Sequence, residues 1–323
     1  MTLPSSLSGS LRPGVPALEV RLLRNGIQES RHRVHAVVCD RRGRVLLRAG
    51  DHQQLSFIRS ALKPFQATAF VASGAAERNG CGERGLAIAC ASHSGTAVHA
   101  REAFRVLWGA ELEASQLQCP QPKGATSPLQ HNCSGKHAAF LATCRQMHWP
   151  VESYLQGDHP LQQEVVKRVG ELLGLPGAEL VMARDDCGAP TLQLQLAQMA
   201  LLFAHLGAGD HPDLERLGRA MLAHPELVAG EGCFDTELMR LGHGQVISKG
   251  GAEGIQCVSR VGEGLGVAVK VEDGSSRAKR AVALHVLEQL GWLTPSSLED
   301  LGQRYLVPGE HLRLAVEGDL RFD

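Results

Sequence analysis

The chain has 323 residues, of which 43% are hydrophobic and 21% are charged, and its formal net charge is −1. This composition predicts a globular protein with a sizeable core, and the near-neutral charge does not point to nucleic acid or an anionic membrane as a partner. The longest apolar stretches, such as 192–206, are too short and too polar to cross a membrane. Residues 1–16 are rich in Ser, Gly and Pro and lack an apolar signal core, which predicts a disordered leader on a cytoplasmic protein.

Nine cysteines are scattered along the chain without the dense spacing of a disulfide scaffold. We expect most of them to be free thiols that pack as small hydrophobic side chains. Cys90, Cys144 and Cys257 fit this expectation because small or apolar residues flank them. Cys133 and Cys187 lie in polar motifs and do not.

The first third of the chain predicts strands followed by a helix. Residues 18–24 alternate in polarity, and 33–39 and 44–48 form two more strand-like segments joined by the turn Asp40-Arg-Arg-Gly43. Residues 60–76 have helical spacing, and a proline at position 64 suits a first turn. This would place Ser60 at or next to a helix N-terminus, where the dipole stabilises negative charge on its oxygen. Residues 86–91 form a short apolar strand or helix.

The middle third is mainly helical, and strands return near the C-terminus. Apolar residues recur at intervals of three and four in segments near 99–110, 135–147, 160–173, 190–206 and 213–223. Three β-like segments follow, and then a final helix: 245–249, 255–261, 265–271 and 276–291. We predict one catalytic domain, 17–323, in which 18–48 and 245–271 form an antiparallel sheet and the helical middle forms a second lobe. The active site would lie between the lobes.

A serine and a lysine at the start of the first helical segment indicate catalysis. Ser60-Ala-Leu-Lys63 places both side chains on one helix face, and a serine hydroxyl needs such a base to become a nucleophile. Lys249-Gly250-Gly251 follows far downstream between strand-like segments. A Ser-x-x-Lys helix with a later Lys-x-Gly strand is the layout of penicillin-binding proteins and serine β-lactamases, which predicts an α/β (α+β) fold of that type. Alone, Ser-x-x-Lys is a weak signal that random sequence often supplies, and two solvent-facing side chains on a helix are the more common explanation for it.

Six ordered motifs carry a more specific resemblance. They are Arg59-Ser-Ala-Leu-Lys-Pro64, Ala91-Ser-His-Ser-Gly95, His131-Asn-Cys-Ser-Gly-Lys-His137, Asp186-Cys-Gly-Ala-Pro-Thr191, His224-Pro-Glu226 with Val228-Ala-Gly230, and Lys249-Gly-Gly-Ala-Glu-Gly254. In this order, over about residues 18 to 292, the chain resembles the asparaginase II family, which is unrelated to the threonine-nucleophile asparaginases. The resemblance implies a homodimeric amidohydrolase that converts L-asparagine to L-aspartate and ammonia.

The resemblance also implies catalytic roles for two serine–lysine pairs. Ser60 and Lys63 form one pair, and Ser92 and Lys249 form the other. We expect Ser60 to be the nucleophile and Lys63 its base, with Ser92 and Lys249 orienting Lys63 and carrying the proton onward. Burial and the nearby charge of Lys249 would lower the pKa of Lys63. The sequence does not exclude the opposite roles for the two serines.

A zinc site is a further implication of the resemblance. Its ligands would be Cys133, Cys187, Lys136 and a water, with His137 and Asp185 behind them as supporting partners. A lysine ligand must be deprotonated, so it makes sense only beside a strong cation. Spacing alone does not establish this site, since two buried thiols are the plain alternative. We expect the metal to position substrate rather than to activate water.

Substrate contacts complete the expectations. Arg59 could bind the α-carboxylate of asparagine through a bidentate fork, and Asn132, His93 and Gly250 could contact the substrate. Glu253 or Asp186 could meet its α-ammonium. The chain departs from the family pattern at Cys233, where an arginine is common, and only Asn132 remains of an asparagine doublet. A cysteine there removes a charge and five donors, so substrate preference is less certain than the chemistry.

Two other functions are compatible with these residues. A Ser–Lys peptidase or D-amino-acid amidase would need an export signal to reach peptidoglycan, and none is visible. A catalytically silent protein that binds an amino acid or a metal on the same scaffold would have no reason to retain Ser60, Lys63, Ser92 and Lys249 together.

Overall fold

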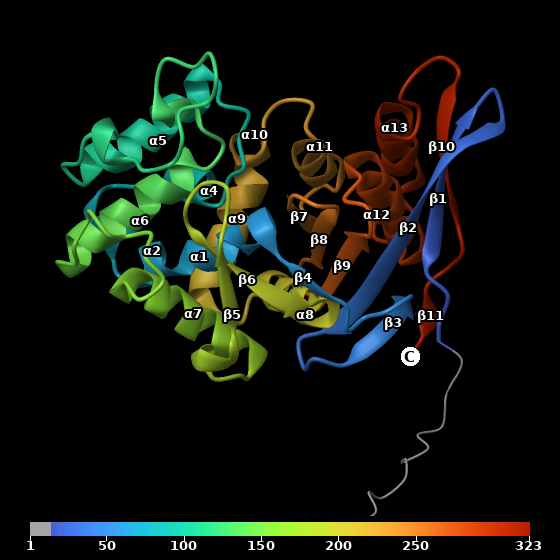
Figure 1. The fold of residues 1–323 in the computed structure, drawn as a ribbon, viewed down its shortest axis with the longest axis horizontal. Helices are drawn as coiled ribbons and strands as arrows, with labels where there is room; N and C mark the ends of the chain where they lie inside the picture. Colours follow the sequence, from blue (N-terminus) through green and yellow to red (C-terminus); the bar gives the residue numbers. More distant parts are fainter. Residues whose placement is uncertain (1–13) are drawn as a thin grey trace, which may run out of the picture.

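The computed structural model describes residues 14–323 as a sheet lobe beside a helical lobe (Figure 1). The main sheet has eight strands in the order β10-β1-β2-β9-β8-β7, with β3 paired to β2 and β11 paired to β3. Every pairing in it is antiparallel. Its strands are β1 (Leu18–Arg24), β2 (Ile27–Asp40), β3 (Val45–Ala49), β7 (Val246–Gly250), β8 (Ile255–Arg260), β9 (Leu265–Val271), β10 (Leu312–Glu317) and β11 (Arg321–Phe322).

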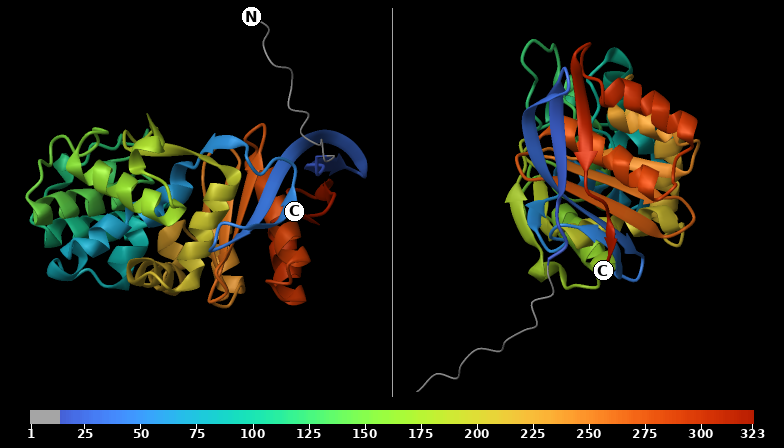
Figure 2. Two further views of the ribbon diagram at one scale, coloured as in Figure 1. Left: turned by 90° about the horizontal axis from the view of Figure 1, so that it is seen from below. Right: turned by 90° about the vertical axis from the view of Figure 1, so that its right-hand side faces the viewer.

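The centre of the sheet is buried on both faces because helices cover each side. Val37 and Cys39 of β2 face the core that includes α8 (Leu196–Ala208). Val34, Ala36 and Val38 alternate with them and face a second core that includes α12 (Ser276–Gln289). Because successive side chains of a strand point to opposite faces, β2 contributes to two separate hydrophobic cores. Figure 2 shows α12 on the outer side of the sheet.

The helical lobe is built around one central helix. α6 (Ser134–Met147) is buried along most of its length and packs against its neighbours. These are α2 (Thr68–Ala72), α3 (Ala75–Arg78), α4 (Glu83–Ala89), α5 (Ala97–Gly109) and α7 (Pro160–Leu173), while α9 (Pro212–Ala223) packs on α4 and α2. A Cβ at Gly135 would lie 2.1 Å from the Ile88 carbonyl oxygen, so glycine lets α6 approach α4 closely. A small second sheet, β4-β6-β5, lies between the lobes (Figure 1).

The predicted architecture is confirmed: an antiparallel sheet from both ends of the chain, flanking helices and a helical middle, as in a serine β-lactamase-like fold. The strands predicted at 18–24, 245–249, 255–261 and 265–271 are present. Residues 86–91, whose apolar pattern predicts either a strand or a helix, lie mainly in α4. Of the expected leader, 1–13 lie outside the described residues, and 14–16 have no regular structure. No helix in 14–323 has the length and apolarity that a membrane span requires.

Three expectations were wrong. The helix predicted over 60–76 is divided into η1 (Arg59–Leu62), α1 (Lys63–Gln66), α2 and α3, and Ser60 lies in the 3-10 turn η1, directly before α1. The first part of the 190–206 helix is a strand, β6 (Pro190–Gln195), because it pairs with β4 (Leu55–Phe57) and β5 (Val181–Arg184). The helix predicted at 276–291 is not the last, since α13 (Pro295–Tyr305) follows it.

Candidate active site

Ser60 lies where the small sheet meets the sheet lobe. Ile58 donates its N–H to Leu192 O at 3.0 Å, and Arg59 donates its N–H to Thr191 Oγ1 at 3.1 Å. Arg59 has a φ of 53°, in the left-handed region that a bulky residue rarely adopts. This turn presents Ser60 to a cavity of about 300 Å³. The cavity is lined by Ser60, Ser92, Asn132, Ala229, Cys233, Phe234, Asp235, Lys249, Gly250, Gly251, Ala252, Gln256, Lys279 and Arg280.

Both predicted lysines converge on Ser92. Lys63 Nζ lies 2.8 Å from Ser92 Oγ, and Lys249 Nζ lies 3.0 Å from the same oxygen. Lys63 also donates to Ala91 O at 2.6 Å, and Lys249 donates to Gly250 O at 2.8 Å. Ser92 is fixed by its own N–H, which donates to Val228 O at 2.8 Å. Within residues 14–323 the Ser60 hydroxyl makes no hydrogen bond, so it remains available to a bound molecule.

The two lysines are buried, and burial is the main reason that their pKa values fall. Each side chain is about 1% exposed. Burial lowers the pKa of Lys63, and the charge of Lys136 adds to this while Cys133 opposes it. Burial lowers the pKa of Lys249 to about 8, against the opposing charge of Asp235. A neutral amine is therefore accessible at this site near neutral pH.

Asp235 was not predicted as a site residue, and it organises the floor of the cavity. Its carboxylate accepts from Ser248 Oγ at 2.7 Å, Gln256 Nε2 at 2.8 Å and Gly250 N at 2.8 Å, and it lies 3.9 Å from Lys249 Nζ. Although burial acts to raise its pKa, these partners lower it on balance, so the group is ionised. Its position two residues after Cys233 gave no indication of this role.

Arg59 does not line the cavity that holds the serines. Its Nε donates to Asp185 Oδ1 at 2.7 Å and its guanidinium donates to Asp186 Oδ2 at 2.5 Å. The Arg59 guanidinium, which was expected to bind a substrate carboxylate, is thus already paired with two protein carboxylates. Asp186 is likewise paired with Arg59 rather than free for an ammonium group.

The other expected substrate contacts divide into two groups. Asn132 and Gly250 line the cavity. His93 is buried, where its Nε2 lies 3.0 Å from Ser134 Oγ and its Nδ1 accepts from Gly95 N; burial lowers its pKa to about 3. Glu253 is exposed and outside the cavity, in a turn whose carbonyl accepts from Lys270 Nζ at 2.6 Å.

The predicted metal ligands are adjacent and buried. Lys136 Nζ lies 3.1 Å from Cys187 Sγ, and Cys133 lies within hydrogen-bonding range of Cys187. The Cys187 thiol, with Lys63 and Lys136, lowers the pKa of Cys133, whereas the hydrogen bond to Cys133 and burial raise that of Cys187. Two cysteine sulfurs and one lysine nitrogen therefore form a compact set, and such donors suit Zn²⁺ once they are deprotonated. The residues fit the group that the resemblance implies.

The expected supporting partners lie close to this set. His137 follows Lys136 on α6, and its Nδ1 lies 2.7 Å from Tyr154 Oη, while its Nε2 is buried without a partner in the described chain. Burial acts to lower the pKa of Lys136, but Cys133, Cys187 and, to a smaller extent, Asp185 raise it on balance. Asp185 is therefore near the cysteine–lysine set, and it also forms an ion pair with Arg59.

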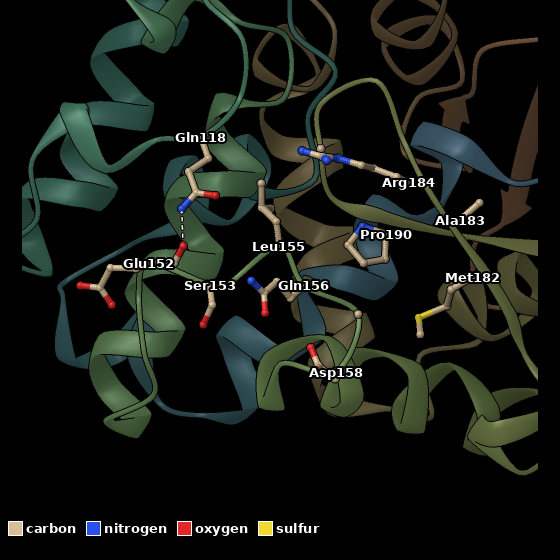
Figure 3. A pocket seen from close by; sticks show the side chains of 12 residues that line it. Gln118, Glu152, Ser153, Leu155, Gln156, Asp158, Met182, Ala183, Arg184 and Pro190 are labelled. Atoms are coloured by element: carbon tan, nitrogen blue, oxygen red, sulfur yellow. Dashed lines mark hydrogen bonds between the residues drawn. The ribbon is translucent and has the colours of Figure 1, made fainter.

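A larger cavity of about 720 Å³ is lined in part by Met182, Ala183 and Arg184 of β5 (Figure 3). Its wall includes Gln118, whose Nε2 donates to Glu152 O at 2.6 Å, together with Arg184 and Pro190. Its lining includes neither Ser60 nor Ser92, and neither Lys63 nor Lys249. We place the chemistry in the smaller cavity because the buried amines and the nucleophile candidates meet there.

The chain matches a known protein family and, distantly, several solved structures. The family described as L-asparaginase II matches residues 20–322, nearly the whole chain. Among curated proteins no match was found. Solved structures match distantly: Mglu in its native form (15% identity, TM-score 0.41) and a Bacillus glutaminase in 4.3 M NaCl (13%, TM-score 0.40). The match covers 80% of this chain in both, with 64% of the Mglu chain and 91% of the glutaminase.

Proposed function

Because the chain belongs to the L-asparaginase II family and is therefore an amidohydrolase, we propose that it converts L-asparagine to L-aspartate and ammonia. One observation supports the chemistry above all others. Two buried lysine amines meet one serine hydroxyl beside a second, free serine in a cavity of about 300 Å³. That volume is at the small end for ligand pockets, as an amino-acid amide requires.

Ser60 is the nucleophile in this proposal. Its hydroxyl lines the cavity without a protein partner in the described residues, so it can approach a substrate carbonyl. Lys63 accepts the proton as the Ser60 Oγ–C bond forms, and the proton passes to the amide nitrogen as the C–N bond breaks and ammonia leaves. Water then attacks the ester, and Ser60 regains its proton. Catalytic hydrogen bonds often tighten only when substrate binds, which accounts for the absent Ser60–Lys63 contact.

Ser92 and Lys249 carry protons in this scheme. Ser92 Oγ connects Lys63 Nζ and Lys249 Nζ at 2.8 and 3.0 Å, so a proton can move between the amines through it. A hydroxyl held by both lysines suits a relay better than an attack. Asn132 lies at the edge of the cavity, where its amide can donate to the developing oxyanion.

Cys133, Cys187 and Lys136 would hold the zinc ion that the family resemblance implies. When bound, the ion would supply a fixed positive charge next to the serine–lysine pairs. On this proposal Lys136 loses its proton on binding, and Asp185 and Arg59 keep the cysteine turn in place. A cytoplasmic location and a homodimer are also part of the proposal, and the family resemblance is what supports the dimer.

The experiment is a substrate panel. Purified protein is assayed for ammonia release from L-asparagine, L-glutamine and β-aspartyl compounds, with and without a chelator. We expect the highest kcat/KM for asparagine. A higher kcat/KM for glutamine would make glutamine, and not asparagine, the proposed substrate. No ammonia release from any of these amides would refute the proposed function.

A further inference from the structure

Arg280 is the one unpaired cation of the active-site cavity within residues 14–323. Three cationic side chains line this cavity: Lys249, Lys279 and Arg280. Lys249 is held by Ser92 and Gly250, and Lys279 Nζ donates to Gly251 O at 2.6 Å and Ile255 O at 3.1 Å. Arg280, on α12, makes no hydrogen bond or ion pair, and its Nε is buried without a partner.

A buried donor without an acceptor is costly unless a ligand satisfies it. The cavity has a single acidic side chain, Asp235, whose oxygens already accept from Ser248, Gln256 and Gly250. It is therefore rich in positive charge and has no free carboxylate. An anion that enters it would find Arg280 as its natural partner.

The guanidinium is also held in place before any ligand arrives. It lies over the ring of Tyr305, with 5.7 Å between its Cζ and the ring centroid. Tyr305 Oη donates to Gly232 O at 2.9 Å, and its ring packs edge-on against Phe234 at 5.0 Å. An arginine fixed in this way loses little side-chain entropy on binding a carboxylate.

We propose that Arg280 binds the α-carboxylate of the substrate and thereby sets the preference for amides that carry a carboxylate. This assignment rests on the proposed amidohydrolase site and replaces the role expected for Arg59, which Asp185 and Asp186 occupy. In asparagine the carboxyl carbon is about 4 Å from the amide carbon, from standard bond lengths. When the amide carbon is at the nucleophile and the carboxylate is at Arg280, this separation is fixed. An amide with one extra methylene therefore fits the two positions less well.

The test compares asparagine with two analogues: succinamate, which lacks the α-ammonium, and 3-aminopropanamide, which lacks the α-carboxylate. We expect the wild-type protein to lose more kcat/KM with 3-aminopropanamide than with succinamate. Arg280→Met should raise KM for asparagine roughly 10- to 100-fold, the usual scale for losing charge-assisted hydrogen bonds, with little change in kcat. It should leave 3-aminopropanamide turnover unchanged. Arg280→Lys should recover part of the loss because it restores the charge without the fork.

Arg277→Met is the matched control on the same helix. Arg277 is exposed and bonds to His32 and Ser30, outside the cavity, so its loss should not change KM. The assignment would be overturned if Arg280→Met had an unchanged KM for asparagine. It would also be overturned if this variant lost as much kcat/KM with 3-aminopropanamide as with asparagine. Calorimetry with L-aspartate and succinate gives a readout independent of turnover. If the wild type hydrolyses no amide, the proposed function fails, and weaker aspartate binding by Arg280→Met still supports the carboxylate site.

Discussion

The charge of Asp235 should control the pH at which the enzyme becomes active. Lys249 must release its proton before it can accept one through Ser92, and its pKa is about 8. A group with that pKa is ~9% neutral at about pH 7 and ~91% neutral at about pH 9, so kcat should rise about tenfold between them. Burial lowers this pKa, and Asp235 at 3.9 Å holds it up.

Asp235→Asn keeps the shape of the side chain and removes its charge. An opposite charge at this distance raises a lysine pKa by about one unit or more, so the midpoint of the alkaline rise should fall to about pH 7. At that pH ~50% of Lys249 would be neutral, and relative to its own plateau the variant should be about five times as active as the wild type. The asparagine that replaces Asp235 disturbs contacts with Ser248 and Gln256, so the plateau itself should fall.

The assay is ammonia release at saturating asparagine from about pH 6 to about pH 10, with circular dichroism to confirm folding. The midpoint is the quantity compared, because it does not depend on the plateau. The reasoning is refuted if chemistry is rate-limiting and the midpoint is the same in both proteins. A profile that is flat across this range would exclude a lysine base altogether.

Two further predictions concern the nucleophile and the metal. Ser60→Ala should lower kcat by ~10³-fold or more without loss of fold, whereas a nearly normal Ser60→Ala beside an inactive Ser92→Ala would make Ser92 the nucleophile. Purified protein should contain up to one zinc per chain by elemental analysis, lost in Cys133→Ser and Cys187→Ser but retained in Cys144→Ser, whose thiol is buried elsewhere on α6. Chelation should raise KM more than it lowers kcat, and normal asparagine binding without turnover in metal-free protein would instead assign the metal to the chemical step.

Several features followed from the sequence because they depend on local chemistry. Alternating polarity located β1, and the glycine-bounded apolar runs located β8 and β9. The motif around Lys249 indicated that the second lysine would lie on a strand, and β7 places it next to Ser92. These elements can be predicted from sequence because a spacing of two, or of three to four, shows which side chains of a single strand or helix are buried.

Other features required the tertiary structure. Residues 190–195 have an apolar pattern compatible with a helix, and their pairing with β4 and β5 decided that they form a strand. Arg59 has the right residue type for carboxylate binding, but Asp185 and Asp186 pair with it from 126 and 127 positions away in the chain.

The same contrast holds within the active site. The sequence named Ser60, Lys63, Ser92 and Lys249, since motif and residue type identify groups able to exchange protons. It also indicated that Ser92 and Lys249 would orient Lys63, but it did not indicate that Arg280 would line the cavity without a partner. Those facts depend on where the fold places Lys249 of β7, beside Ser92 in the loop after α4, and Arg280 of α12, in the lining of the same cavity. Which polar group finds a partner is a property of the whole fold, because each hydrogen bond is made between distant segments.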